Sequence, residues 1–372
     1  MGNNKSQPIQ PVQPAHRAQR PHRAHVRSDY TIAWICALPD SELPAAIAML
    51  DERHPALPGA DAKDPNEYVL GRIGKHNVVI TCLQPGQTGT SPAARVGVGL
   101  LRSFPSVRVC LMVGVGGGVP RHGVSPGGLD TRDVRLGDVV VSLDLKGSAG
   151  VVQYNMGTLS EGNRFVHTGG SIRKPAPFIL SAAAVLRQQH ERRGNRLPEL
   201  LNKALTRNPQ IAAKFSKPLT PDTLFKTDPR HTHTHRGQPC DMNCAGKTNS
   251  NLVTRPQRPS RDPVIHYGII GSADQVLKRA TERDRLSQAF DVICVEMEGA
   301  GLMNIFPCLV IRGICDYSDS HKNKEWQPYA AGMAAAYAKE LLLLISDQDV
   351  TTLPPAGQWR TKARPLVGEQ GR

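Results

Sequence analysis

The chain has 372 residues, of which 39% are hydrophobic and 5% aromatic, and its 34 glycines and 30 prolines predict extensive loops and tails. No run of about 18 apolar residues occurs, which excludes a transmembrane helix. The net charge is +14, but residues 1–28, 187–262 and 350–372 carry +5, +9 and +3 while the remainder carries −3, so the folded part offers no basic scaffold for specific nucleic-acid binding.

Residues 1–28 are rich in Pro, Gln, His and Arg and are predicted to form a disordered basic tail. The tail begins with a pattern that fits N-myristoylation, in which Gly2 is exposed after removal of the initiator methionine. A single acyl chain needs a second membrane signal, and the arginines of the tail would supply it. A weak membrane contact through Gly2 acylation is one hypothesis, and a chance match in a polar tail is the other.

The first buried strand is predicted at Thr31–Leu38, and an amphipathic helix follows it. Two acids, Asp40 and Glu42, lie at the start of this helix. Tyr68–Ile73 and Asn77–Leu83 are then predicted to pair as a hairpin.

A loop rich in Gly and Thr follows the hairpin and includes Gly89 and Thr90. It opens a helix that carries Arg95. Backbone N–H groups and hydroxyls at a helix N-terminus can form a pocket for phosphate or water, although a tight turn explains the glycines equally well. The predicted central strand, Val109–Val113, comes next and ends in a glycine run whose spacing does not match a dinucleotide-binding motif.

A low-order insert is predicted at about 192–262, after a helix at Phe178–Glu191. The insert contains side chains of the types that bind zinc, namely His231, His233, His235, Cys240 and Cys244. Alternating histidines also occur in low-complexity segments. We therefore assign no metal to the predicted active site and leave open whether the insert itself binds one.

The core resumes with a strand at Val264–Gly271, followed by Ser272 and Asp274, either of which would cap a helix. The last long helix is predicted at Pro328–Ile345. Trp326 precedes this helix directly, and a hydrophobic staple is one explanation for an aromatic residue at this place.

Two buried strands are predicted at Val292–Val295 and Leu309–Ile311, and both run into acidic residues. Glu296 and Glu298 follow the first strand, and Asp316 follows the second. Ligands of open α/β sheets bind at the carboxyl ends of strands, where carboxylates can act as acids, bases or hydroxyl-binding groups. The alternative is that these acids only stabilise helix N-termini.

The segments VEMEGAG (295–301) and RGICDYSD (312–319) closely resemble the signature of the nucleoside phosphorylase and nucleosidase superfamily. The resemblance is closest to the fungal branch and extends in patches from Ile32 to about Ile345. Buried strands alternating with helices predict a single α/β domain with a central, mostly parallel mixed sheet flanked by helices. We expect this nucleoside phosphorylase-like domain at 29–346 and a C-terminal tail at 347–372.

The resemblance implies cleavage of the N-glycosidic bond of a purine ribonucleoside. It implies that Asp316, held protonated or sharing a proton, acts as the acid at N7 of the base, and that Glu298 binds the ribose 2′ and 3′ hydroxyls. Met297 would pack on the sugar, and Glu296 would be structural or a minor ribose contact. Glu42 best matches the family's general base, with Asp40 as the alternative. The other nucleoside-contacting positions that it implies are Gly116, Gly117, Ser272, Asp274 and Trp326, and the ring of Trp326 would stack on the base.

One departure from the family pattern concerns phosphate. Hexameric purine phosphorylases hold phosphate with an arginine and a serine, and the matching positions here are Met112 and Val115. Only Arg95, in the helix after the Gly89–Thr90 loop, could substitute. We therefore expect hydrolysis by water rather than phosphorolysis, with phosphate as an alternative co-substrate and no other cofactor.

A second hypothesis is a ligand-sensing effector of the same fold with little turnover. No P-loop and no 33- or 34-residue repeat is visible, so we expect the domain to stand alone. Eight irregularly spaced cysteines, five of them in apolar runs, predict free buried thiols in a reducing compartment. We expect a cytoplasmic homo-oligomer that binds a small nucleoside, with membrane association or a nuclear location as alternatives.

Overall fold

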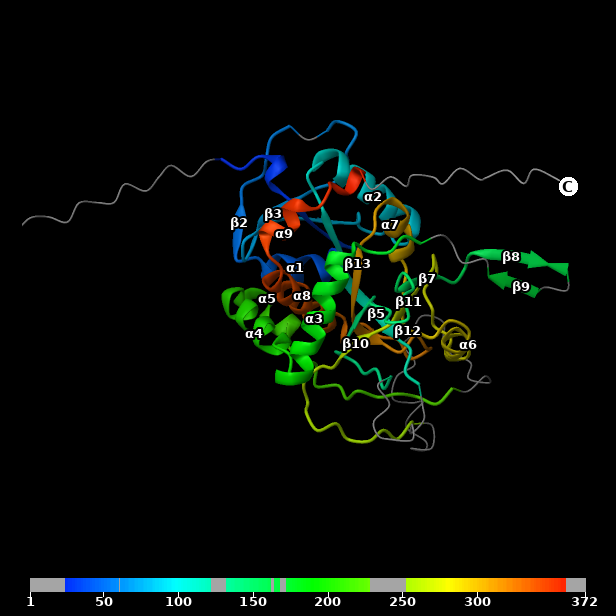
Figure 1. Cartoon of the computed structure of the whole chain (residues 1–372). Coiled ribbons are helices and arrows are strands. Elements are labelled where there is room, and N and C mark those ends of the chain that lie inside the picture. Colours follow the sequence, from blue (N-terminus) through cyan, green and yellow to red (C-terminus); the bar gives the residue numbers. More distant parts are fainter. Residues whose placement is uncertain are drawn as a thin grey trace, which may run out of the picture.

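In this computed structural model the described residues are 24–358 except 60, 122–131, 162–163, 168–171 and 228–251 (Figure 1). The strands are β1 (Ile32–Cys36), β2 (Glu52–His54), β3 (Val69–Ile73), β4 (His76–Cys82), β5 (Val109–Gly118), β6 (Val139–Val141), β7 (Val151–Gln153), β8 (Gly157–Ser160), β9 (Arg164–His167), β10 (Ile265–Tyr267), β11 (Ile269–Ser272), β12 (Val292–Glu296) and β13 (Leu309–Asp316). The helices are α1 (Glu42–Met49), α2 (Thr90–Ser103), α3 (Pro177–Arg193), α4 (Leu197–Arg207), α5 (Pro209–Phe215), α6 (Ala280–Phe290), α7 (Gly299–Ile305), α8 (Gln327–Leu344) and α9 (Asp347–Thr352).

The predicted fold class, a mostly parallel mixed sheet flanked by helices, is confirmed. The main path of the sheet has the order β10-β6-β13-β5-β1-β4-β3-β2, and β12, β11 and β7 branch from it. β5 pairs in parallel with β1 and β13, and its last residues pair antiparallel with β12. The carboxyl ends of β13 and β5 therefore lie next to the end of β12, which brings the acidic strand ends together.

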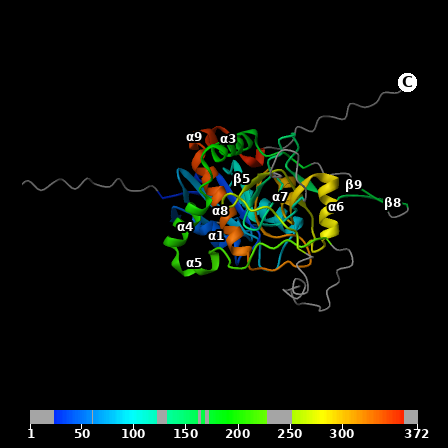
Figure 2. The ribbon, with the colours of Figure 1, turned by 90° about the horizontal axis from the view of Figure 1, so that it is seen from below.

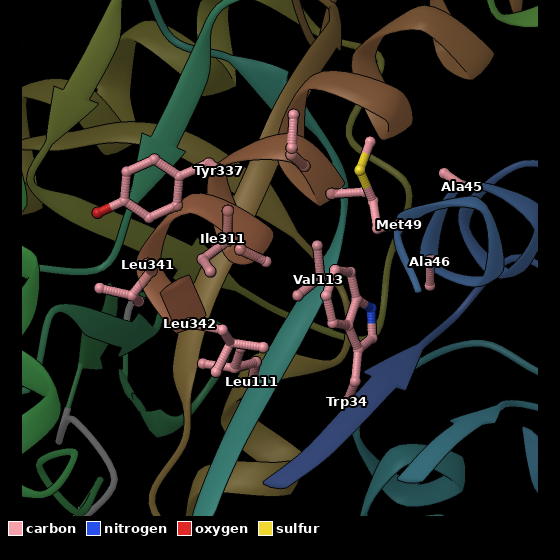
Figure 3. Packing of buried hydrophobic residues seen from close by; sticks show 14 of the residues in the cluster. Trp34, Ala45, Ala46, Met49, Leu111, Val113, Ile311, Tyr337, Leu341 and Leu342 are labelled. Carbon is pink, nitrogen blue, oxygen red and sulfur yellow. The ribbon is translucent and has the colours of Figure 1, made fainter. Parts of the chain in front are cut away.

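Side chains alternate between the two faces of the sheet, and each face has its own hydrophobic core. Ile32, Trp34 and Cys36 of β1 point to one core, whereas Ala33 and Ile35 point to the other. Figures 1 and 2 show α1, α4 and α8 on one side of β5 and α7 on the other. Figure 3 shows the first core, where strand residues meet α1 and α8; the labelled side chains are Trp34, Ala45, Ala46, Met49, Leu111, Val113, Ile311, Tyr337, Leu341 and Leu342.

The predicted low-order insert at 192–262 is wrong in its first part, because residues 197–215 form α4 and α5. One face of α4 is buried in the first core through Leu197, Leu200, Leu201, Ala204 and Leu205. The expected C-terminal tail is likewise structured at its start. It forms α9 and then turns back, and the Ala356 N–H donates to the Val107 carbonyl oxygen (2.7 Å).

Several predictions fall on residues outside the described part of the chain. These are the Gly2 acylation, most of the basic tail at 1–28, and the histidines and cysteines between 231 and 244. Within the described ranges, no helix is both long and apolar enough to cross a membrane. The six described cysteines carry free thiols, and five of them are buried.

Candidate active site

A fully buried arginine, Arg312, lies in the middle of β13 and faces three glutamates. Its guanidinium contacts Glu296 directly and lies 3.5 Å from Glu298 and 4.0 Å from Glu42. The sequence analysis missed Arg312. The sequence does carry a signal for it, since Arg312 interrupts the apolar run Leu309–Ile314. A charge buried in such a strand needs charged or polar partners nearby.

Glu42 enters this cluster from the first turn of α1, whereas Asp40 is exposed. Glu42 Oε2 accepts hydrogen bonds from the N–H groups of Ala37 (2.6 Å) and Leu38 (3.1 Å), and Oε1 accepts one from Val115 (2.8 Å). Burial raises the pKa of Glu42, although Arg312 and these N–H groups oppose the rise. Of the two candidate acids, the structure thus brings Glu42 to the cluster.

Gly114 allows this approach, since a Cβ there would collide with the carboxylate of Glu42 and lie 2.6 Å from Arg312 Nη1. The sequence analysis singled out Gly116 and Gly117 and overlooked Gly114. A Cβ on Gly116 would press on Cys294 at 2.5 Å, and one on Gly117 would collide with Ser318. The glycine run of β5 is therefore required by close packing around the strand end.

Glu296 ends β12, Glu298 follows it by two residues, and the two differ in their partners. Glu296 Oε2 accepts from the N–H groups of Glu298 (3.0 Å) and Gly299 (2.8 Å), so it caps α7 as well as pairing with Arg312. Glu298 accepts a hydrogen bond from the Gly89 N–H (3.3 Å). Burial raises the pKa of Glu298 to about 7, with Arg312 opposing the rise and Glu296 adding to it. Met297, between the two, is partly exposed.

Asp316 ends β13 opposite Gly117 of β5. Its carboxylate forms an ion pair with Lys322 (2.9 Å) and accepts the N–H of Ser318 (2.9 Å). Burial alone would lower the pKa of Lys322, but the charge of Asp316 outweighs it and raises that pKa above its usual value. Lys322 is a second residue that the sequence analysis missed, because the turn that returns it to Asp316 is not visible as a pattern.

Two loops close over Glu298 and are joined by Asp274. The Thr90 N–H (2.5 Å) and hydroxyl (2.8 Å) both donate to Asp274 Oδ1, so Asp274 holds the start of α2. Gly89 has a φ of +102°, a conformation that favours glycine. Ser272 accepts the Ala300 N–H (3.0 Å) and thereby holds the start of α7.

Two predicted site residues lie elsewhere. Arg95 is exposed and hydrogen-bonds Gln87, so it does not reach the carboxylates. Trp326 is only 3% exposed and packs in the first core against Tyr329, with ring centroids 5.9 Å apart. Its predicted stacking on a base is therefore wrong, because the residue that begins α8 follows this helix into the core.

No group of three His, Cys, Asp or Glu side chains is arranged to hold a metal ion in the part of the chain that the structure describes. What the site offers is a set of buried acids with two cations. It can hold hydroxyl groups, activate a water molecule and exchange a proton with a leaving group.

Comparison with solved structures identifies the class to which this fold belongs. The 5′-methylthioadenosine/S-adenosylhomocysteine nucleosidase of Neisseria meningitidis, solved with methylthio-immucillin-A, superposes with a TM-score of 0.50 over 85% of this chain and 99% of that chain, at 15% identity. A protein of Francisella philomiragia described as a nucleosidase of this type gives 0.50 over 84% and 98%, at 16% identity. The fold is that of these nucleosidases.

Sequence relatives agree with this fold, while no family model matches the chain. A nucleotide-binding leucine-rich repeat (NLR)-like protein of Hyaloscypha variabilis is 43% identical over 320 residues, which is 86% of this chain and 30% of that protein. The 5′-methylthioadenosine/S-adenosylhomocysteine nucleosidase of Mycobacterium tuberculosis is 32% identical over 105 residues, or 27% of this chain and 41% of that enzyme. The chain thus spans well under half the length of both relatives.

Proposed function

We propose that the protein hydrolyses the N-glycosidic bond of purine ribonucleosides, with water as the nucleophile. The observation that carries this proposal is a set of buried carboxylates: those at the end of β12 and in the first turn of α1 surround Arg312, and Asp316 at the end of β13 pairs with Lys322. Breaking this bond creates positive charge on the ribose and negative charge on the base. Carboxylates on the sugar side and a proton donor on the base side match both charges.

Asp316 is the proposed acid at the base. A proton drawn from the Lys322 ammonium through the paired Asp316 carboxylate (2.9 Å) and passed to N7 lets the purine leave as a neutral molecule, and Lys322 is left neutral until water protonates it again. Acid assistance of this kind is worth about 10²–10⁴-fold in rate.

Glu298 is the proposed ribose ligand, because a carboxylate can accept hydrogen bonds from the 2′ and 3′ hydroxyls together. Met297 would cover the apolar face of the sugar. Gly116 and Gly117 of β5 would act indirectly, because the space beside them is filled by Cys294 and Ser318, which pack against the strand end next to Asp316.

Glu42 is the proposed base for the attacking water. Its carboxylate already takes the N–H groups of Ala37, Leu38 and Val115, which are the donors that an incoming anion would need. A phosphate dianion there would be repelled by this carboxylate, whereas water would be activated by it. Asp274 similarly takes the N–H of Thr90 at the start of α2.

The test uses the full chain and a panel of purine and pyrimidine nucleosides, with and without inorganic phosphate. We expect free base and free ribose at a rate that phosphate does not change. Ribose 1-phosphate as the product would overturn hydrolysis, and cleavage of pyrimidine nucleosides alone would overturn the purine assignment.

A second candidate is a nucleoside-sensing module with little turnover. The NLR-like relative favours it. This chain aligns with that protein over 320 residues but covers only 30% of its length, so the matching region is one part of a larger NLR-like protein. Calorimetric titration with a non-cleavable nucleoside analogue separates the two functions. Tight binding without release of base from the natural nucleoside supports the sensor, and turnover supports the enzyme.

A further inference from the structure

Two stretches of the chain, residues 220–227 and 252–258, form a strap beside the loop that follows β13. The two stretches are joined to each other by a bridge between Phe225 and Leu252 and by a hydrogen bond from the Val253 N–H to the Leu224 carbonyl (2.9 Å). Both belong to the segment that the sequence analysis treated as a low-order insert. Neither contributes a carboxylate to the cluster around Arg312, so the proposed mechanism leaves the strap unexplained.

The strap holds Tyr317, the neighbour of Asp316, by its phenol. The hydroxyl of Tyr317 donates to Asp222 and accepts from Arg255 Nη1 (2.8 Å), and Arg255 also pairs with Asp222 (2.8 Å). The guanidinium of Arg255 lies 5.4 Å from the Tyr317 ring centroid. Burial, and then the charge of Asp222, raise the pKa of the Tyr317 phenol well above its usual range, so the hydroxyl keeps its proton.

Further contacts hold the remainder of the loop up to Lys322. The ring of Phe225 stacks on that of His321, with centroids 3.6 Å apart and planes 7° apart. Buried Arg283 of α6 joins loop and strap, since it donates to the Tyr317 carbonyl (3.0 Å) and to the Thr227 hydroxyl (3.1 Å). Tyr317, next to Asp316, and His321, next to Lys322, are thus both held from outside the sheet.

The backbone of this loop explains why external support is needed. Ser318 has a φ of +54°, a left-handed conformation that a non-glycine residue adopts only when its surroundings impose it. Its side chain packs where a Cβ on Gly117 would lie. If Tyr317 were released, we expect this turn to relax and the Asp316 carboxylate to shift relative to β5.

We propose that the strap is a positioning device for the acid of the site, with Arg255 and Asp222 as positioning residues that act on Asp316 through Tyr317. The catalytic part of this proposal rests on the proposed function. Displacing a catalytic group by about 1 Å can lower the rate by about 10²-fold, so a contact remote from the substrate can control turnover. The strap also binds Asp138 through Arg258, but of the proposed catalytic residues only Asp316 lies next to a residue that it holds, so its loss should impair substrates that require protonation of the leaving group.

The experiment compares the full chain with Tyr317→Phe and Arg255→Ala. The matched control is Tyr30→Phe, which removes a buried phenol bound to His54 (2.9 Å) away from the strap. Amide hydrogen exchange is measured in 316–322 and, as an internal reference, in 309–315. We expect exchange in 316–322 to rise by about fivefold or more in both strap variants, the effect of losing roughly one hydrogen bond, and to stay unchanged in the control.

Turnover is then measured with a purine nucleoside and with p-nitrophenyl riboside, whose leaving group needs no proton. We expect kcat for the purine nucleoside to fall about 10- to 100-fold in the strap variants, and the riboside to change less than about twofold. If amide exchange in 316–322 is unchanged in the strap variants, the strap does not hold this loop and the proposal fails, whatever the activity. Equal losses on both substrates overturn its role in positioning the acid. A wild type that exchanges as expected but cleaves no nucleoside refutes the proposed function and leaves the strap as a structural element only.

Discussion

At the scale of single residues, the site contains more buried negative charge than positive charge. Arg312 faces Glu42, Glu296 and Glu298, and all four side chains are buried. Burial raises the pKa of Glu42 and Glu298, and Arg312 opposes the rise. One guanidinium cannot balance three buried carboxylates, so ionising all three would carry a large free-energy penalty. The cluster is therefore expected to hold a proton in the free protein, and that proton makes stability depend on pH.

The first prediction concerns this pH dependence. Glu298 has a pKa of about 7 in the folded chain against 4.5 as its ordinary value, so folding takes up a proton between these values. The stability that this provides is complete below about pH 4.5 and is lost as pH rises through about 7, at up to about 1.4 kcal/mol per pH unit. We expect Glu298→Gln to flatten the decline, as measured by urea denaturation at several pH values. Identical slopes in wild type and variant would contradict the prediction.

The second prediction separates the acid from the sugar ligand. Asp316→Asn keeps the size of the side chain but cannot transfer a proton, so purine nucleoside cleavage should fall about 10²–10⁴-fold while p-nitrophenyl riboside is spared. Glu298→Gln should impair both substrates, because both use the ribose hydroxyls. Steady-state kinetics on the two substrates provide the measurement. Undiminished purine cleavage by Asp316→Asn would refute the site assignment.

At the scale of elements, the site depends on how closely α7 packs on α2. Gly301 of α7 lies directly against the backbone of Thr90, and a Cβ there would overlap the Thr90 carbonyl oxygen. Gly97 of α2 also lies close to α7, since a Cβ on Gly97 would be 3.0 Å from a methyl group of Leu302. The start of α2 carries Gly89, which bonds Glu298, so helix packing also sets the position of a site residue.

The third prediction follows from this packing. Gly301→Ala should destabilise the protein by about 1–3 kcal/mol, because backbone rather than a flexible side chain must move. The measurement is the free energy of unfolding from denaturant titration. The control is Gly357→Ala, since a Cβ on Gly357 would meet no atom within 4 Å. If both variants lose the same stability, close helix packing is not the cause.

The whole molecule is organised by two cores on opposite faces of the sheet, and α4 extends the first of them. Leu201 of α4 is 2% exposed and packs over Gly332 of α8, where a Cβ would lie 2.9 Å from the leucine methyl. A helix from the supposed insert is thus part of the main core. We expect α4 to unfold together with the sheet and not as a separate unit.

The fourth prediction tests this arrangement. Leu201→Ala should cost about 2–5 kcal/mol and shift the whole transition, so that helix content by circular dichroism and tryptophan fluorescence, to which buried Trp34 and Trp326 contribute, change together. Leu219→Ala is the control, because Leu219 is an exposed leucine from the same region. A helix signal lost before the tryptophan signal would show that α4 folds independently.

The sequence by itself determined the elements with a strong local pattern. The apolar runs predicted β1, β4 and β12 to within about two residues and the start of β13, since strand formation depends on neighbouring side chains; β13 itself extends five residues further than predicted, to Asp316. The acids at the ends of β12 and β13 were also found, but these ends meet because β12 pairs antiparallel with the end of β5 while β13 pairs with it in parallel, which the local pattern did not indicate. The fold class followed from the same alternation of strands and helices.

Only the tertiary structure decided which side chains meet. Arg312 and Lys322 join the acids through strand register and through a left-handed turn at Ser318, and neither leaves a periodic signal in the sequence. Trp326 looked like a base-stacking residue but is directed into the core by α8. The apolar face of α4 was obscured by its basic, proline-containing surroundings. Its stability comes from burial against α8, a long-range contact that no local window of sequence contains.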